Sequence, residues 1–238
     1  MGRRVSLTEA GQALLPHARE VSRNMEQALQ SIHDLSGSIA GRLRVATSHH
    51  IGLHRLPPIL RQYSETYPGV SLDIDFMDSE QAHEEVSRGT TELAVVTLAP
   101  EIPAGLIALP IWPDPLDFMA VAEHPLARAG KLSLEDLAAH PVILPGGATF
   151  TGRIIRDLFE REGLRLEISL STNYLETIRM MASVGLGWTL LPRSMLMPPL
   201  QSLAVPGHRP ERTLGLLYHR GRSLSKAAQA FMALLPAR

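Results

Sequence analysis

Cysteine is absent from this sequence of 238 residues, which excludes disulfide bonds, zinc sites built on thiolates and thiol catalysis. Long apolar stretches are missing too, so we expect no membrane span. Arg3 and Arg4 are not followed by the apolar segment that an export signal needs, which favours a cytoplasmic protein. Neither sign of charge is in excess, because the formal net charge is −1. The net charge therefore gives no indication that these residues alone bind nucleic acid.

The remaining composition is typical of a globular protein. Hydrophobic residues make up 45% of the sequence and charged residues 20%. The length allows one large domain or two small ones. The pattern changes near Gly41, where one long helical segment gives way to alternating strand-like and helix-like segments.

The first 40 residues predict one long helix. Thr8 is the expected N-cap, and almost no turn-forming residue follows until Gly37. Apolar residues then step by alternating fours and threes, the spacing of a coiled-coil seam. The predicted dimerisation seam consists of Leu14, Ala18, Val21, Met25, Ala28, Ile32 and Leu35. The alternative is an amphipathic helix lying on its own domain, and Pro16 predicts a kink or a start at Leu15 because proline removes a helical hydrogen bond.

Residues 41–75 predict a βαβ unit, because apolar residues follow a period of two, then helical spacing, then a period of two again. Such a unit requires parallel strands, and ligands of these sheets bind where the strands end at their carboxyl side. At this edge lies the turn formed by Ser48, His49, His50 and Ile51. Its backbone N–H groups suit a carboxylate or a similar anion. The alternative is that Ser48 merely caps the following helix.

A second crossover follows, with a helix expected at 79–88 and a buried strand at 92–97. Thr97 ends this strand at the same sheet edge as Ser48, so we expect the two residues to lie near each other. Further strands are expected at 106–111 and 117–122. An acidic cluster is predicted to be a solvated face, and it consists of Asp73, Asp75, Asp78 and Glu80.

From Glu123 onward the pattern starts again and predicts a second α/β lobe. The turn at 145–151 carries glycines and the hydroxyls of Thr149 and Thr151, and a helix is expected directly after it, at 152–162. This turn resembles the one at Ser48, so we expect helix N-termini of two lobes to face one cleft. The other expected elements lie at 134–138, 142–144, 166–170, 174–183, 187–191, 213–219 and 225–235.

Motifs for nucleotide binding and catalysis are missing. Gly146-Gly147 lacks the Gly-Lys-Ser/Thr ending of a phosphate loop, and Gly185-Leu186-Gly187 precedes a strand instead of opening a helix. No Gly-x-Ser-x-Gly elbow occurs, so a hydrolase of that class has no visible nucleophile, and no spacing singles out an acid–base pair. We expect no enzyme and no cofactor. His50 and His54 can share one helical face, with His49 beside them, but two histidines without a nearby acidic residue do not complete a metal site. We therefore expect no metal.

Taken in order, several motifs resemble those of LysR-type transcriptional regulators. Residues 4–11, Arg-Val-Ser-Leu-Thr-Glu-Ala-Gly, resemble the end of the wing and the start of the linker helix in that family. The later matches are Leu56-Pro57-Pro58-Ile59-Leu60 with Tyr67-Pro68, Gly89 with Glu92-Leu93-Ala94-Val95, His124-Pro125-Leu126-Ala127, and Gly185-Leu186-Gly187 with Leu191-Pro192. Glu92 departs from the family, which usually has aspartate there.

The resemblance implies an α/β fold with two Rossmann-like lobes joined by two crossover strands, like a type 2 periplasmic binding protein, after a long N-terminal linker helix. It implies a wing remnant and dimerisation helix at 1–40, a first lobe at 41–120 plus 212–238, and a second lobe at 121–211. It also implies effector contacts from both lobes. These are Ser48, His49, His50, Ile51, Thr97, Thr149, Phe150, Thr151 and Asn173.

The function that the resemblance implies is that of the ligand-sensing and dimerising portion of a DNA-binding regulator. A small-molecule effector, expected to be anionic, would bridge the lobes of a homodimer or homotetramer. DNA contact is expected only through a helix-turn-helix, for which there is no room before Arg3. The alternative is a solute-binding protein of a transporter, which the missing export signal and the seam helix disfavour. An enzyme is the third alternative, after a regulator and a solute-binding protein.

Overall fold

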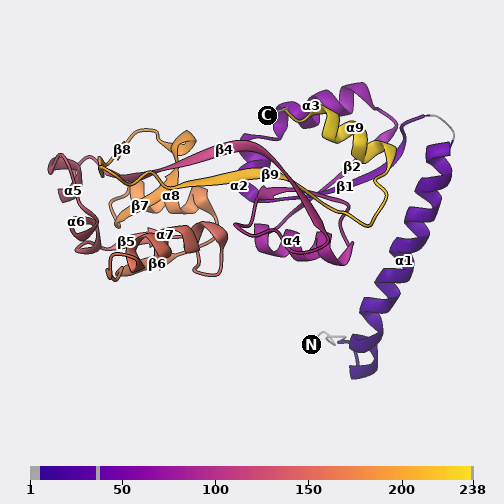
Figure 1. Cartoon of the computed structure of the whole chain (residues 1–238), viewed down its shortest axis with the longest axis horizontal. Helices are drawn as coiled ribbons and strands as arrows, with labels where there is room; N and C mark the ends of the chain where they lie inside the picture. The colour runs from indigo at the N-terminus through magenta and orange to yellow at the C-terminus, as the bar shows by residue number, and fades with distance from the viewer. Residues whose placement is uncertain (1–5, 36–37, 237–238) are drawn as a thin grey trace, which may run out of the picture.

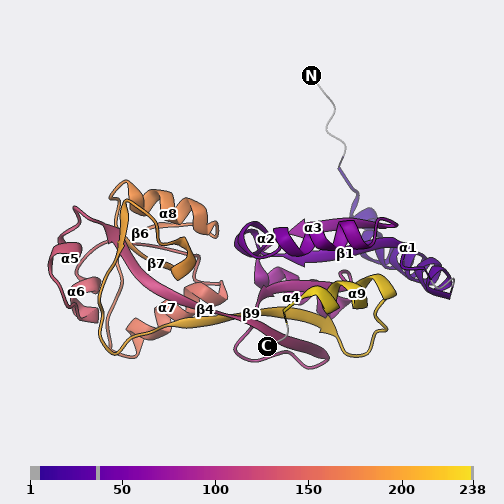
Figure 2. The same ribbon diagram turned by 90° about the horizontal axis from the view of Figure 1, so that it is seen from above.

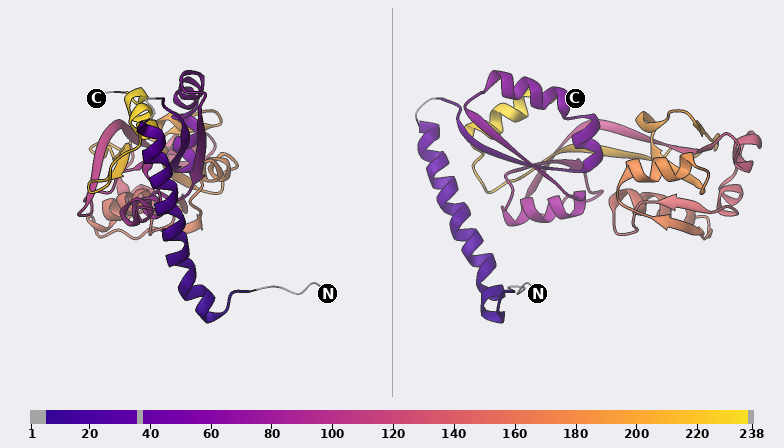
Figure 3. Two further views of the ribbon diagram at one scale, coloured as in Figure 1. Left: turned by 90° about the vertical axis from the view of Figure 1, so that its right-hand side faces the viewer. Right: turned by 180° about the vertical axis from the view of Figure 1, so that it is seen from behind.

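The computed structural model describes residues 6–35 and 38–236 and contains one long helix followed by two α/β lobes (Figure 1). Helix α1 (Glu9–Leu35) stands apart from both lobes, as the rear view also shows (Figure 3, right). Residues 1–5, in the region predicted as the wing remnant, and residues 36–37, where Gly37 is predicted to end the helix, lie outside the described residues. Among the described helices, none is both long and apolar enough to cross a bilayer.

The two lobes have similar contents. The first holds β1 (Gly41–Thr47), α2 (His49–His54), α3 (Pro57–Thr66), β2 (Val70–Phe76), α4 (Ser79–Arg88), β3 (Leu93–Thr97) and α9 (Lys226–Leu234). The second holds α5 (Pro125–Arg128), α6 (Leu134–Ala138), β5 (Val142–Leu144), α7 (Phe150–Glu160), β6 (Ile168–Ser171), α8 (Leu175–Ser183), β7 (Trp188–Pro192), the 3-10 turn η1 (Arg193–Met195) and β8 (Leu200–Ser202).

Two long antiparallel strands, β4 (Leu106–Val121) and β9 (Glu211–His219), run between the lobes (Figure 2). The strand order is β2-β1-β3-β9-β4-β7-β5-β6, with β8 also paired to β4. Strand β1 is parallel to both β2 and β3, as the βαβ pattern predicted. The carboxyl ends of these three strands therefore meet at one edge, which faces the second lobe.

The first-lobe sheet is covered by helices on both faces. Leu93 and Val95 of β3 pack in the core beneath α3 and α9, whereas Ala94 and Val96 pack with Ala82 and other residues on the α4 side (Figure 1). A parallel strand buried on both faces needs apolar residues at every position. This burial explains why the continuous apolar run predicted the strand correctly.

Helix α1 is not packed on a lobe. Its N-cap is Thr8, whose Oγ1 accepts a hydrogen bond from the Gly11 N–H at 3.1 Å, as predicted. The helix begins at Glu9 and continues through Pro16, so the alternative start at Leu15 is wrong. The seam residues Leu14, Val21, Met25 and Ile32 are each 64% exposed. Their exposure rules out the alternative of an amphipathic helix lying on its own domain.

Two predicted elements need correction. The strands expected at 106–111 and 117–122 are one strand, β4. Pro110, Pro113 and Pro115 are tolerated there because this stretch pairs with β9 on one side, and pairing with β7 starts only at Leu116. The turn expected at Ser48 is already the N-cap of the short helix α2, and α3 follows with proline in its first turn.

Candidate functional site

A cavity of about 420 Å³ lies between the lobes, where β1, β2 and β3 end. Its volume is in the range of pockets that hold small molecules. The predicted site residues that line it are Ser48, His49, His50, Thr97, Thr149, Phe150, Thr151 and Asn173. Ile51 does not line it, because its side chain is fully buried in the first-lobe core. The structure thus brings residues of both lobes to one cavity, and their role as effector contacts stays a prediction.

The sheet edge places the first-lobe residues. Thr47 pairs with Phe76 on β2 and with Val95 on β3, so the residues that follow these strand ends share the edge. Ser48 and Thr97 both line the cavity. Within the acidic cluster, Asp78 and Glu80 line it as well. Asp78 is exposed, as the prediction of a solvated face requires, whereas Glu80 is half-buried. The rule that predicted Ser48 and Thr97 would also have found them, because β2 ends just before Asp78.

The start of α7 forms the wall of the cavity in the second lobe. Thr149 caps this helix, because its Oγ1 accepts a hydrogen bond from the Gly152 N–H at 3.0 Å and donates one to the Gly146 carbonyl at 2.7 Å. A Cβ atom at Gly152 would lie 2.2 Å from the Gly146 oxygen, so this turn closes only with glycine. Ser48, by contrast, makes no side-chain hydrogen bond that caps α2. The alternative that Ser48 serves merely as a cap is therefore not supported.

Polar contacts cross the cavity from one lobe to the other. Asn173 Nδ2 donates to Asp78 Oδ2 at 2.6 Å, and the backbone N–H of Phe150 donates to Glu80 Oε1. Rings also meet across it, since His49 lies edge-on to Tyr174 with centroids 5.7 Å apart. These contacts hold the two walls together in the arrangement described.

A buried arginine lies at the junction of the crossing strands. Arg212 is 7% exposed; its Nε donates to Asp114 Oδ2 at 2.7 Å and its Nη1 to Thr151 Oγ1 at 2.8 Å. Its Nη2 has no hydrogen-bond partner among the described residues, although Arg212 lines the cavity. Arg55 Nη2 also lies 3.4 Å from Asp114 Oδ1, so two guanidinium groups share one carboxylate. Sequence reasoning missed this group because charged residues on strands usually face solvent.

Two buried histidines have lowered pKa values. Burial is the main cause that lowers the pKa of His50 to about 3, and the charge of Arg212 acts in the same direction. Burial also lowers the pKa of His83, against the hydrogen bond between its Nε2 and the Thr97 carbonyl, which raises it. Both rings are therefore neutral at pH 7.

The fold and the cavity define a two-lobed ligand-binding module. A family model described as the LysR substrate binding domain matches residues 36–238, and the chain belongs to this family. It is the effector-binding portion of a LysR-type transcriptional regulator. This result favours the regulator over the alternative of a solute-binding protein for a transporter.

Curated relatives match nearly the whole chain. The HTH-type transcriptional activator CmpR of Synechocystis sp. is 28% identical over 99% of this chain and 78% of its own length. The uncharacterized HTH-type transcriptional regulator YeiE of Escherichia coli K12 is 29% identical over 98% of this chain and 79% of its own length. Both relatives are named as transcriptional regulators.

Solved structures agree on the fold. The C-terminal domain of a probable LysR family regulator from Rhodococcus sp. RHA1 has a TM-score of 0.72 and 26% identity, covering 82% of this chain and 98% of that one. The effector-binding domain of QuiR in complex with shikimate has a TM-score of 0.73 and 17% identity, covering 82% and 95%. The regulatory domain of Synechocystis CcmR in complex with 2-PG has a TM-score of 0.73 and 24% identity, covering 81% and 94%.

Proposed function

We propose that this chain senses a small carboxylate that also carries hydroxyl or amino groups, and that it binds this effector in the cavity between the lobes. One observation carries the proposal: the buried guanidinium of Arg212 lines the cavity with its Nη2 unpartnered among the described residues. A buried donor without a partner is costly, and a charged donor more so. A carboxylate oxygen of the effector would satisfy it.

The local charge also favours an anion. The guanidinium groups of Arg212 and Arg55 share the single carboxylate of Asp114, which leaves one positive charge in excess. The first turn of α7 adds the positive end of a helix dipole. Its Phe150 N–H already binds a carboxylate, that of Glu80, and its Gly152 N–H binds the capping Thr149. Shikimate, named in the QuiR structure, is itself a carboxylate.

The opposite wall calls for hydrogen-bond donors on the effector. Asp78 and Glu80 line the cavity beside the start of α4, and ionised carboxylates can only accept hydrogen bonds. A ligand with anionic groups alone would meet repulsion on this side. Hydroxyl or amino groups elsewhere on the effector would donate to Asp78, whereas Glu80 would give up its place at the start of α7 to the effector carboxylate.

The regulatory mechanism that we propose is a shift in the arrangement of the lobes. An effector shifts the equilibrium only by the difference in its affinity for the two arrangements. The shift would change the spacing of DNA-binding domains that α1 joins in a homodimer or homotetramer, with DNA bound through a helix-turn-helix outside these residues.

The proposed domain division follows the crossing strands. Residues 1–40 serve assembly, residues 41–120 plus 212–238 form one lobe, and residues 121–211 form the other. The protein would work in the cytoplasm without catalysing a reaction.

The test is a thermal-shift screen of the chain against small hydroxy and amino carboxylic acids, followed by titration calorimetry. Ligand at a hundred times its dissociation constant should add about 2.7 kcal/mol to the free energy of unfolding. Ser48→Ala should weaken binding by roughly 1 kcal/mol or more without unfolding the protein, because its hydroxyl makes no capping bond. Ser202→Ala is the control, because Ser202 is an exposed residue of β8 that does not line the cavity. Equal affinities in both variants would contradict the site assignment.

A further inference from the structure

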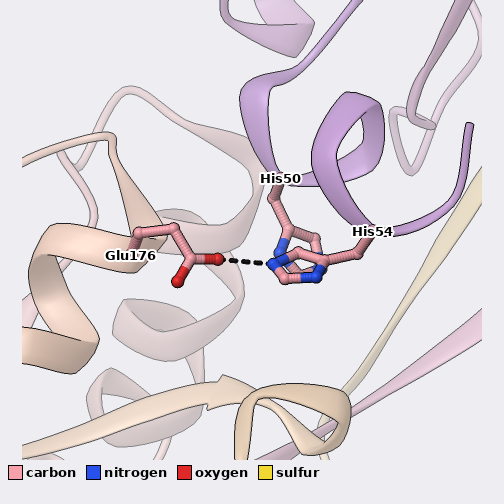
Figure 4. Close-up of side chains that lie close together, drawn as sticks. All are labelled: His50, His54 and Glu176. Carbon is pink, nitrogen blue, oxygen red and sulfur yellow. Dashed lines mark hydrogen bonds and ion pairs between the residues drawn. The ribbon is translucent and has the colours of Figure 1, made fainter. Parts of the chain in front are cut away.

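Three potential metal-ligand side chains converge beside the cavity (Figure 4). His50 and His54 come from α2 of the first lobe, and Glu176 comes from α8 of the second. One ligand atom from each lies within 4.8 Å of the other two. The sequence placed the two histidines on one helical face but contained no acidic residue near them. The structure supplies that residue from 122 positions further along the chain.

His50 is the member of this group whose environment points to a ligand. The residue is 4% exposed, and among the described residues neither its Nδ1 nor its Nε2 has a hydrogen-bond partner. Burying a polar group without a hydrogen bond is unfavourable, and buried polar atoms in proteins are rarely left unpaired. Both ring nitrogens of His50 are therefore available to a ligand, and an imidazole nitrogen is the commonest metal donor in proteins.

We propose that His50, His54 and Glu176 bind a divalent transition metal ion, of which Zn²⁺ is the representative. Two histidines four residues apart on a helix, together with one glutamate, form a ligand set that zinc accepts, with a fourth position left for water or a group of the effector. Imidazole ligands also suit Ni²⁺ and Cu²⁺. His50 lines the effector cavity, so the fourth position would be next to it.

Small movements bring these atoms to coordination distance. Ligand atoms around zinc lie about 3.3 Å apart, given bonds of about 2.0–2.1 Å. His54 Nε2 and Glu176 Oε1, now 2.5 Å apart, would separate slightly to admit the ion in place of their shared proton, and His50 would approach. The side chains of His54 and Glu176 are partly exposed, so both have room to rotate.

The second oxygen of Glu176 stays engaged. Arg179 Nε donates to Oε2 at 3.3 Å, which orients the carboxylate and leaves Oε1 for the metal. Partners of this kind commonly fix the orientation of a ligating group. The metal would then link α2 to α8 and hold the two lobes together at a point separate from Arg212 and from the start of α7.

The experiment is calorimetric titration of the chelator-treated chain with ZnCl₂ at neutral pH, without any organic effector. We expect one Zn²⁺ per chain and an affinity at least tenfold lower in His54→Ala and in Glu176→Gln. Glu176→Gln keeps an oxygen that can hydrogen-bond His54 but removes the ligand charge. Co²⁺ offers a second readout, because the wild type should show absorption bands of a low-coordinate site that both variants lose.

His140→Ala is the matched control. His140 and His124 form another neighbouring pair, with ring centroids 5.3 Å apart in the second lobe, and this pair is not part of the three-residue cluster. Zn²⁺ affinity unchanged in His54→Ala and Glu176→Gln, or lost equally in His140→Ala, would overturn the proposal. If the chain binds Zn²⁺ but none of the carboxylates, the metal site is supported and the proposed function is not. If it binds a carboxylate but no Zn²⁺, the proposed function is supported and the metal site is overturned.

Discussion

The carboxylate of Glu80 accepts a hydrogen bond from the Phe150 N–H, so a first-lobe side chain occupies the start of α7 in the second lobe. This is the kind of place where helices bind external anions. Glu80 therefore resembles the effector carboxylate in charge and in position. An anionic effector that reaches this helix must compete with it.

Glu80→Gln is expected to increase the affinity for a carboxylate effector. The substitution removes a negative charge from the helix N-terminus, where a charge interaction is worth about 0.3–1 kcal/mol, so affinity should rise roughly 2- to 5-fold. Titration calorimetry with a hit from the screen measures the change. Glu84→Gln, on the same helix but paired with Arg88 at the surface, is the control and should have no effect.

The buried His83 is expected to make the free energy of unfolding depend on pH. Burial lowers the pKa of His83 below its ordinary value of 6.5, so the native state binds fewer protons than the unfolded state between the two pKa values. Its contribution to stability is therefore fully present above pH 6.5 and is lost as the pH falls toward the folded-state pKa. Urea denaturation between about pH 8 and about pH 5 should show a smaller loss on acidification in His83→Gln than in the wild type.

The exposed His17 on α1 provides the comparison for His83. His17→Gln should leave the pH profile of the wild type unchanged. A His83→Gln profile that overlays the wild-type profile would show that His83 does not contribute.

At the scale of elements, the starts of α2 and α7 look alike in sequence but differ in structure. Thr149→Ala removes a cap that α7 uses, and should lower the free energy of unfolding by about 1 kcal/mol. Ser48→Ala should lower it much less, because the hydroxyl of Ser48 caps nothing. Denaturant titration of the two variants side by side measures both. Equal losses would mean that Ser48 is also a working cap.

Elements with a complete local signal were predicted well from the sequence. Helix α4 matches its predicted bounds, since Gly89 ends it in the left-handed conformation with φ of 69°. Strand β5 matches because it is a short, fully buried apolar run. Strand β8 was missed, because its three residues are defined mainly by their pairing with β4. Such pairing is a tertiary property that local patterns do not contain.

The same limit applies to the site. Ser48 and Thr97 could be predicted because both follow the ends of neighbouring parallel strands. Arg212 and Asp114 are 98 positions apart, and only the pairing of β4 with β9 places them opposite each other. Glu176 reaches His54 only because the two lobes face each other. Contacts that depend on how the lobes pack against each other could therefore not be predicted from the sequence.

At the scale of the molecule, the exposed apolar face of α1 predicts self-association. Val21→Asp with Met25→Asp should dissociate the proposed dimer. Burial of each such side chain contributes roughly 1.5–3 kcal/mol, and both chains lose two of them, so the dissociation constant should rise at least about a hundredfold. Sedimentation equilibrium measures it.

Ser22→Asp tests whether added charge alone is responsible. It introduces one charge on α1 outside the predicted seam, so the protein should remain associated. Unchanged association of the double variant would mean that α1 is not the interface.

The path of the chain through β4 and β9 has a consequence for modularity. Pro115 and Glu211 are paired neighbours where the chain leaves the first lobe and returns to it, so the second lobe is one continuous insertion with adjoining ends. When the two ends of a domain lie side by side, that domain can be inserted into a host, exchanged or circularly permuted while the host keeps its fold. A short turn joining β4 to β9 at this pair would close the first-lobe sheet with its strand order unchanged. We therefore expect the second lobe to tolerate exchange as one continuous segment of the gene, which is a route to regulators with new ligand preferences.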